Sequence, residues 1–250
     1  MDPLLAAVAF PPALALGSFL TVVAARLPAH QSVVGGRSCC VSCGSQIRWH
    51  DNIPIVSYLV LRGRCRDCST RYGLRYPLVE LLTALLVAAC FARFGLTAEG
   101  FVAAFFVAVL VVLSAIDLEH LILPDRIVLP AAAIVLTANC ALFPDRAPEF
   151  VLAALATSTF LFLALLAYPR GMGMGDVKLA LLMGAALGKS VAVALAIGLV
   201  SALAVSVVIL AREGMAGRKR AIPFGPFLAF GSVVALFAGE RVLDGYLGLF

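Results

Sequence analysis

The stretch "FVAAFFVAVLVVLSAIDLEHLILPD" (residues 101–125) decides what kind of protein this is. It is apolar from Phe101 to Ile116 except for Ser114, and the carboxylate of Asp117 follows directly. A run of this length approaches the roughly 20 residues that an α-helix needs to cross a bilayer. The stretch therefore predicts a membrane-spanning helix that ends at an acid.

The composition of the whole chain supports this prediction. Of its 250 residues, 62% are hydrophobic and 13% are charged, and the mean hydropathy is +1.05. Soluble domains average about 25% charged residues, so we expect an integral membrane protein. In such a protein the net charge of +5 reflects topology and contact with anionic lipid, and no nucleic-acid partner is expected.

Eight apolar segments have the length, or nearly the length, of a membrane span. All are expected to be helical because open sheet edges are not tolerated in lipid. The segments are residues 4–25, 78–93, 100–117, 126–143, 149–168, 177–188, 190–211 and 222–240. The sixth is short, so residues 177–211 form either two helices joined by a turn at Gly188-Lys189-Ser190 or one long broken helix.

A polar segment divides the chain into three predicted parts: a first transmembrane helix (1–26), a polar domain (27–77) and a transmembrane domain (78–250). With eight spans, four loops face one side of the membrane and, with Arg26, hold 15 of the 19 lysines and arginines. These loops are residues 27–77, 117–126, 168–178 and 212–221. The positive-inside rule therefore predicts a cytoplasmic polar domain in a multi-pass membrane protein.

Two cysteine pairs in the polar domain have the spacing of a metal site. Cys40/Cys43 and Cys65/Cys68 are each C-x-x-C pairs, with 21 residues between them. Structural zinc sites commonly use two such pairs separated by about 15–20 residues, and four thiolates complete a tetrahedral site. We therefore expect these four cysteines to bind a structural zinc ion, which would stabilise a segment too short for a large core.

The alternative for the four cysteines is a pair of redox-active or disulfide-forming couples. A cytoplasmic location keeps thiols reduced, which favours metal binding. Cys39 is expected to lie outside the site, although its position next to Cys40 would let it substitute. Cys90 and Cys140 lie in apolar runs and are expected to be small core residues.

A second carboxylate is predicted to lie near Asp117. The stretch "YPRGMGMGDVKLA" (168–180) places Asp176 at the start of the sixth apolar segment, on the same predicted side as Asp117. Two carboxylates that share a proton can activate water and protonate a leaving amine. An acid at a helix C-terminus is electrostatically unfavourable, which favours a functional role for Asp117. We therefore expect Asp117 and Asp176 to form a catalytic pair.

The residues around Asp176 are expected to support it. Gly171, Gly173 and Gly175 allow backbone conformations that are closed to other residues, so an extended peptide could approach the acid closely. Lys178 is expected to pair with a carboxylate or a lipid phosphate.

Three other polar residues have simpler interpretations. Asp125 follows Pro124 and precedes an apolar run, as the N-cap of a helix would. Glu119 and His120 are expected to be solvated in a short loop.

Taken together, these motifs resemble the type IV prepilin peptidases, which are bifunctional leader peptidases and N-methyltransferases. "GSFLTVVAARLP" (17–28) resembles the family's first helix, with Thr21 where the family usually has Asn. "IDLEHLILPD" (116–125) and "GMGMGDVKL" (171–179) are similar to the two catalytic stretches, and the G-x-G-D aspartate corresponds to Asp176. The polar domain and "IPFGPFLA" (222–229) resemble the zinc domain and the last-helix motif.

The resemblance implies an aspartyl endopeptidase of the bacterial cytoplasmic membrane. Its substrates would be prepilins and pseudopilins, cleaved after a glycine at the cytoplasmic face by Asp117 and Asp176, with Gly173, Gly175 and Lys178 supporting the site. The new N-terminus would be methylated from S-adenosylmethionine, although the resemblance assigns no residue to the methyl donor. The remaining alternatives are a peptidase without methylation, a scaffold that binds an assembly ATPase, and a transporter that uses the aspartates as ion ligands.

Overall fold

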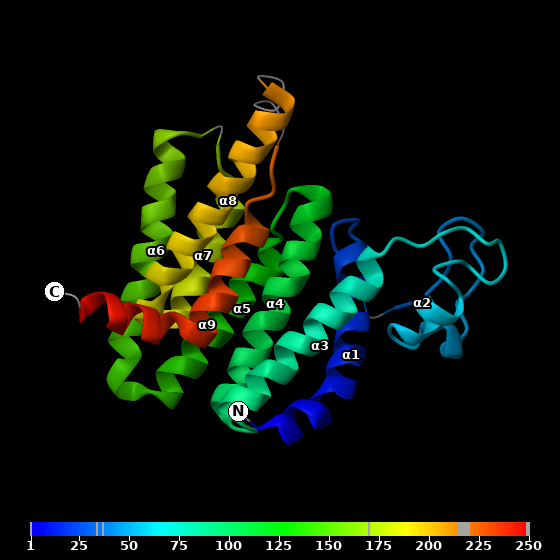
Figure 1. Cartoon of the computed structure of the whole chain (residues 1–250), viewed down its shortest axis with the longest axis horizontal. Coiled ribbons are helices and arrows are strands. Elements are labelled where there is room, and N and C mark those ends of the chain that lie inside the picture. The colour runs from blue at the N-terminus through cyan, green and yellow to red at the C-terminus, as the bar shows by residue number, and fades with distance from the viewer. Residues whose placement is uncertain (1, 34, 37, 170, 215–220, 249–250) are drawn as a thin grey trace. The chain divides into compact units, whose positions relative to one another are not determined.

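The computed structural model describes residues 2–33, 35–36, 38–169, 171–214 and 221–248 (Figure 1). The described residues are mostly helical and contain no β-strand, only two isolated β-bridges in the cysteine-containing segment. The α-helices are α1 (Pro3–Arg26), α2 (Val56–Val60), α3 (Arg75–Phe94), α4 (Ala98–His120), α5 (Asp125–Leu142), α6 (Ala147–Ala167), α7 (Met174–Leu187), α8 (Val191–Glu213) and α9 (Gly225–Leu247). Short 3₁₀ helices cover Trp49–Asn52, Pro144–Arg146 and Gly188–Ser190.

Seven candidate membrane spans occur in the described part of the chain, and the longest is Met174–Glu213 with 40 residues. A straight helix of that length would measure about 60 Å, twice the hydrocarbon thickness of a bilayer. The structure instead interrupts it at Gly188–Ser190, where Gly188 has a φ of +54°. Of the two alternatives for residues 177–211, the structure shows two helices joined at Gly188–Ser190, and each of the eight predicted apolar segments corresponds to a helix.

The chain forms two compact units, Met1–Ala115 and Ile116–Phe250. The first unit contains the paired helices α1 and α3 and the cysteine-containing segment between them. The second contains α5 to α9 and the last turn of α4, so both predicted catalytic aspartates belong to it. Five cations of the topology prediction, Arg37, Arg170, Arg218, Lys219 and Arg220, lie outside the described residues.

Glycines permit the closest helix contacts in both units. A Cβ atom on Gly17 of α1 would lie 2.7 Å from the Glu80 Cα atom of α3. In the second unit, a Cβ on Gly184 would lie 2.5 Å from the Ala154 backbone, which brings α7 against α6. Gly231 plays the same role between α9 and α8. Small residues at these positions allow the van der Waals contact that holds membrane helices together.

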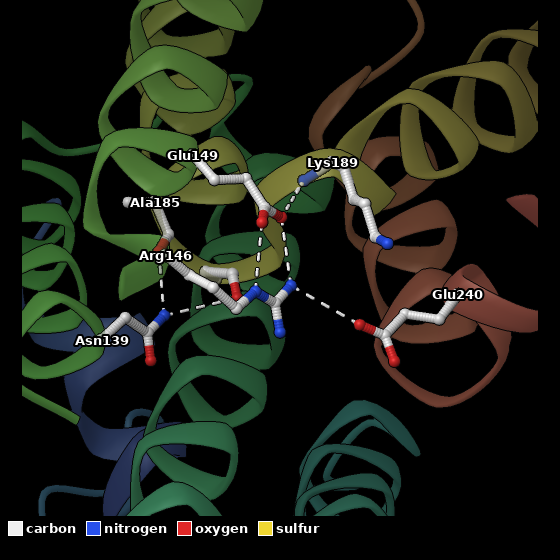
Figure 2. Close-up of polar contacts among 7 residues, drawn as sticks. Asn139, Arg146, Glu149, Ala185, Lys189 and Glu240 are labelled. Atoms are coloured by element: carbon white, nitrogen blue, oxygen red, sulfur yellow. Dashed lines mark hydrogen bonds and ion pairs between the residues drawn. The ribbon is translucent and has the colours of Figure 1, made fainter. Parts of the chain in front are cut away.

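A polar network ties the helices of the second unit together at the end of α7 away from Asp176 (Figure 2). The Arg146 guanidinium contacts both Glu149 oxygens at 3.1 Å and a Glu240 oxygen at 3.5 Å. Glu149 also accepts a hydrogen bond from the Lys189 backbone N–H at 3.0 Å. Nearby, the Asn139 amide donates to the Ala185 carbonyl at 2.9 Å and joins α5 to α7. The network fixes the start of α6 against the end of α7 and therefore the direction of α7.

The α6–α7 contact generates a prediction about stability. Gly184→Ala places a methyl group against the α6 backbone, which cannot move aside as a flexible side chain can. We expect a loss of about 1–3 kcal/mol and a lower melting temperature in detergent. Gly245→Ala in α9 is the matched control, because no atom lies within 4 Å of its added methyl group. Equal melting temperatures for the two variants would contradict this packing.

Candidate active site and metal cluster

Asp117 lies in the last turn of α4 and is 5% exposed. Its Oδ2 atom accepts a hydrogen bond from the backbone N–H of Gly225, the first residue of α9, at 2.9 Å. An acid at the end of α4 faces that helix's own carbonyl groups, which is unfavourable. The N-terminus of α9 supplies an N–H donor and the positive end of a helix dipole, and so offsets this penalty.

Asp176 is the third residue of α7 and is 8% exposed. Its Oδ2 atom accepts a hydrogen bond from the N–H of Gly173, the N-cap residue, at 3.1 Å. This is the carboxylate half of a capping box. Both aspartates are therefore buried, and each is held at the N-terminus of a helix.

Leu123, in the loop between α4 and α5, packs against the start of α7, which carries Asp176, and against the start of α9, which donates to Asp117. A Cβ atom on Gly175 would lie 2.9 Å from the Leu123 Cβ, and one on Gly225 would lie 3.4 Å from its Cδ2. The starts of α7 and α9 thus pack against the same side chain. The structure brings together the two aspartates that the sequence analysis paired.

The expected reason for the glycines before Asp176 is wrong. None of Gly171, Gly173 and Gly175 has a positive φ, and Gly173 has an extended backbone with φ −94° and ψ 156°. Gly175 is required instead because Leu123 leaves no room for a Cβ. A Cβ on Gly173 would make ordinary contacts of 3.7 Å or more. A Cβ on Gly171 would also clash with the Tyr168 ring, so the constraint at Gly171 and Gly175 is close packing and not an unusual dihedral angle.

The interpretation of Asp125 as an N-cap is also wrong. Pro124 occupies the N-cap position of α5, and Asp125 is the first residue of the helix. Both Asp125 oxygens accept hydrogen bonds from the Lys178 ammonium at 2.7 Å, so Lys178 pairs with a carboxylate, the first of its two expected partners. This ion pair is partly exposed and joins α5 to α7 beside the aspartates. Glu119 and His120 are exposed, as expected, but they are the last two residues of α4 and do not lie in a loop.

The Sγ atoms of Cys40, Cys43, Cys65 and Cys68 lie within 4.8 Å of one another. The Cys40–Cys68 and Cys43–Cys65 sulfur separations are 3.7 and 4.0 Å. Metal–sulfur bonds of about 2.3 Å in a tetrahedron require sulfur separations of about 3.8 Å. The four cysteines could therefore hold a metal ion with little rearrangement.

The two C-x-x-C loops have the same backbone conformation. In each loop the N–H of the first cysteine, Cys40 or Cys65, donates to the carbonyl five residues later, at 2.9 and 2.8 Å. The residue after the second cysteine has a positive φ in both loops, +71° at Gly44 and +59° at Ser69. The repeated turn directs all four sulfurs to one point.

Hydrogen bonds favour the thiolate form of Cys40 and Cys65. The pKa of Cys68 is instead raised, because the lowering by hydrogen bonds with Thr70 is outweighed by desolvation and by the neighbouring thiols of Cys43 and Cys65. The backbone N–H groups of Cys43 and Ser42 lower the pKa of Cys40 to about 6. Backbone N–H groups of the second loop likewise lower the pKa of Cys65, and the Tyr72 hydroxyl is hydrogen-bonded to both sulfurs. Metal ligation requires thiolates, so the chemistry of this donor set fits a metal ion. Cys39 is exposed and outside the cluster, and Cys90 is fully buried in α3, as expected.

Comparisons with known proteins show the family of this chain. Residues 12–94 match the bacterial peptidase A24 N-terminal domain, and residues 104–217 match the type IV leader peptidase family. A relative from Bacillus subtilis, named prepilin leader peptidase/N-methyltransferase, is 34% identical over 238 residues, which cover 94% of each chain. The chain belongs to the type IV leader peptidase family.

Other members of this family carry the same name. The Pseudomonas aeruginosa relative is 35% identical over 264 residues, which cover 94% of this chain and 90% of the relative. A Myxococcus xanthus relative is 51% identical over 128 residues, but the match covers 51% of this chain and 38% of that protein. None of the solved structures matches this chain.

The sequence analysis missed two residues of the aspartate site, Gly225 and Leu123. Gly225 belongs to the last-helix motif, and the following Pro226 is a residue favoured at the start of a helix. That signal could have identified a helix N-terminus available to a carboxylate. For Leu123 there was no such signal, because a leucine in a short loop has no distinctive pattern.

The cysteine geometry predicts a metal content of one ion per chain, measurable by elemental analysis of the purified protein. Cys65→Ser should lose most of this metal, while Cys39→Ser should retain it, because only Cys65 belongs to the cluster. The affinity for the metal should fall as the pH is lowered, because protons compete with the metal for the cysteine thiolates. Full metal retention in Cys65→Ser would contradict the assignment.

Proposed function

We propose that this protein is an intramembrane aspartyl endopeptidase that removes the leader peptide of prepilins and pseudopilins and N-methylates the new N-terminus. The observation that carries the proposal is the pair of buried carboxylates, Asp117 and Asp176, gathered around Leu123. The names of the full-length relatives support both activities. The proposed substrates have a short basic leader, a glycine before the scissile bond and an apolar helix.

In the proposed mechanism the two aspartates share one proton. The ionised carboxylate takes a proton from a water molecule, whose oxygen attacks the scissile carbonyl carbon. The protonated partner then donates its proton to the leaving amine. The N–H groups of Gly225 and Gly173 hold the two carboxylates in position while the proton moves between them. These backbone groups lie at the N-termini of helices and need not reorganise during the reaction.

We assign the metal of the cysteine cluster as structural zinc. Four thiolates leave no open coordination position, which is typical of structural and not catalytic zinc sites. When bound, zinc would cross-link Cys40, Cys43, Cys65 and Cys68 and stabilise the segment between α1 and α3. The methyl donor is proposed to be S-adenosylmethionine, which supplies an electrophilic methyl group.

We place the zinc domain and the aspartates on the cytoplasmic side of a bacterial cytoplasmic membrane. The support is the distribution of cations, with 15 of 19 lysines and arginines in the loops assigned to that side. Arg146 and Lys189, assigned to the opposite side, both contact Glu149 and therefore lie at one end of the second unit (Figure 2).

The dyad is tested by conservative substitutions in a cleavage assay with a model prepilin. Asp117→Asn and Asp176→Asn should each reduce the cleavage rate at least 1,000-fold, because asparagine cannot transfer the proton. Asp125→Asn is the matched control, since that residue only pairs with Lys178 at the surface, and it should cost less than tenfold. Normal cleavage by Asp117→Asn would overturn the proposed mechanism, whereas a wild-type protein that does not cleave the model prepilin would leave a scaffold or transporter as the alternative.

The glycines of the G-x-G-D motif should differ in their tolerance of a methyl group. Gly175→Ala forces Leu123 away from the start of α7 and shifts the neighbouring Asp176, so cleavage should fall on the order of 100-fold. Gly173→Ala meets only ordinary contacts and should retain most of the activity. The rates are compared at equal membrane abundance. Equal rates for the two variants would show that Leu123 does not position the site.

A further inference from the structure

The short helix α2 of the cysteine-containing segment has the opposite polarity from a helix on an aqueous surface (Figure 1). Val56, Leu59 and Val60 are 52%, 68% and 70% exposed, and their i, i+3, i+4 spacing places them on one face. Both hydroxyl groups of α2 are instead bonded to the protein. Ser57 donates to the His50 carbonyl at 2.9 Å, and Tyr58 donates to the Tyr72 carbonyl at 3.4 Å. A helix that faces water normally buries its apolar face and exposes its polar face.

Two neighbouring residues extend this exposed apolar face. Trp49 is 78% exposed and begins a 3₁₀ helix that contacts α2, and Ile53, between the two helices, is 41% exposed. Neither helix is a candidate membrane span. Single exposed apolar residues need no explanation, but a group of them marks an interaction surface. The apolar patch is defined here as Trp49, Ile53, Val56, Leu59 and Val60.

The charge around the apolar patch is complementary to anionic lipid. Residues 27–77 contain seven arginines, two aspartates and neither lysine nor glutamate, so their net charge equals the +5 of the whole chain. Arg48 directly precedes Trp49, Arg62 follows α2, and both are exposed. Asp51 lies within the same stretch, but its carboxylate is paired with the Arg66 guanidinium at 2.8 Å. Basic segments next to membrane helices are attracted to anionic lipid headgroups.

The connections of the segment favour lipid over a protein partner. The segment is joined to α1 at one end and to α3 at the other, and both helices are candidate membrane spans. A segment tethered in this way meets the lipid surface at a high effective concentration, whereas a soluble partner must first associate.

A strained residue and a buried acid hold α2 in its orientation. Ile55, directly before α2, has a φ of +60°, which β-branched residues rarely adopt. Such a conformation persists only where the surrounding structure holds it. The Ile55 N–H donates to the Oε2 atom of Glu80 in α3 at 2.8 Å, and Glu80 is 8% exposed. This hydrogen bond fixes the start of α2, and therefore the direction of its apolar face, against a membrane helix.

We propose that the apolar patch is an in-plane membrane anchor. Its five side chains insert at the boundary between the headgroups and the acyl chains, and the flanking arginines bind the phosphates of anionic lipids. Tryptophan is enriched at this boundary, and amphipathic segments with basic residues bind there. Glu80 is a positioning residue for the anchor. The inference is independent of the proposed enzymatic activities.

The first test uses the fluorescence of Trp49, which is the only tryptophan of the chain and so reports on the apolar patch alone. The full chain is reconstituted in nanodiscs of phosphatidylglycerol and a phosphatidylcholine brominated near the headgroup end of its acyl chains. The bromine should quench at least half of the emission, and acrylamide in the buffer should quench little. Emission that is unquenched by bromine and open to acrylamide would overturn the anchor and leave a protein partner or a second copy as the occupant.

The contribution of the arginines is measured by omitting the anionic lipid. In nanodiscs of the brominated phosphatidylcholine alone, the fraction of emission quenched should be at least twofold smaller, because the cations lose their partner. Equal quenching with and without phosphatidylglycerol would overturn anionic lipid as the occupant.

A pair of variants tests the apolar face itself. Leu59→Asp places a charge in the face that enters the bilayer and should lose most of the bromine quenching. Val41→Asp is the matched control, because Val41 is 95% exposed but lies in the first C-x-x-C loop, outside the apolar patch. Both variants should melt as the wild type does, since neither position is buried. Equal quenching in the two variants would overturn the assignment of this face.

The role of Glu80 is tested with two substitutions in the same nanodiscs. Glu80→Gln keeps an oxygen that can accept from the Ile55 N–H and should retain the quenching of the wild type. Glu80→Ala removes the acceptor, so α2 should lose its orientation and the quenching should fall at least twofold. Unchanged quenching in Glu80→Ala, or an equal loss in Glu80→Gln, would overturn this role of the hydrogen bond.

Discussion

A carboxylate buried in a membrane protein needs a compensating donor, and the second unit is arranged around two such carboxylates. A charged side chain at the centre of a membrane helix costs about 2.5–3.5 kcal/mol or more. Asp117 is stabilised by the N-terminus of α9 and Asp176 by that of α7. The positions at which these two helices begin are therefore tied to the positions of the acids. Leu123 fills the space between the two helix starts.

The packing of the other helices maintains this arrangement. Helix α7 has 14 residues, so its position depends on its neighbours more than on its length. Gly184 allows α6 to approach its backbone, Asn139 links it to α5, and the Arg146–Glu149 network fixes its far end. A shift at any of these contacts would move Asp176 away from Asp117. Catalytic precision in this unit depends on tight, mostly apolar contacts distant from the aspartates.

The first unit is subject to a different constraint, because its polar segment must be ordered beside a membrane. Its cysteine-containing segment has few buried apolar side chains, and two matching C-x-x-C turns bring four sulfurs to one point. The Ile55–Glu80 hydrogen bond links this segment to α3. Between the segment and the helices lies a cavity of about 770 Å³.

The sequence by itself predicted the helices, the cluster of four cysteines and the pair of aspartates. Each has a local signal: apolar runs of membrane length, C-x-x-C spacing, and acids placed directly at the ends of apolar runs. Only the tertiary structure shows that Gly175 is needed because of its contact with Leu123. It also shows that Asp125 pairs with Lys178. The hydrogen bond from the Gly225 N–H to Asp117 likewise joins residues 108 positions apart. The cavity facing Glu80 was decided in the same way. The physical reason is that each of these features joins residues far apart in the chain, and residue spacing carries no information about which helix ends meet in space.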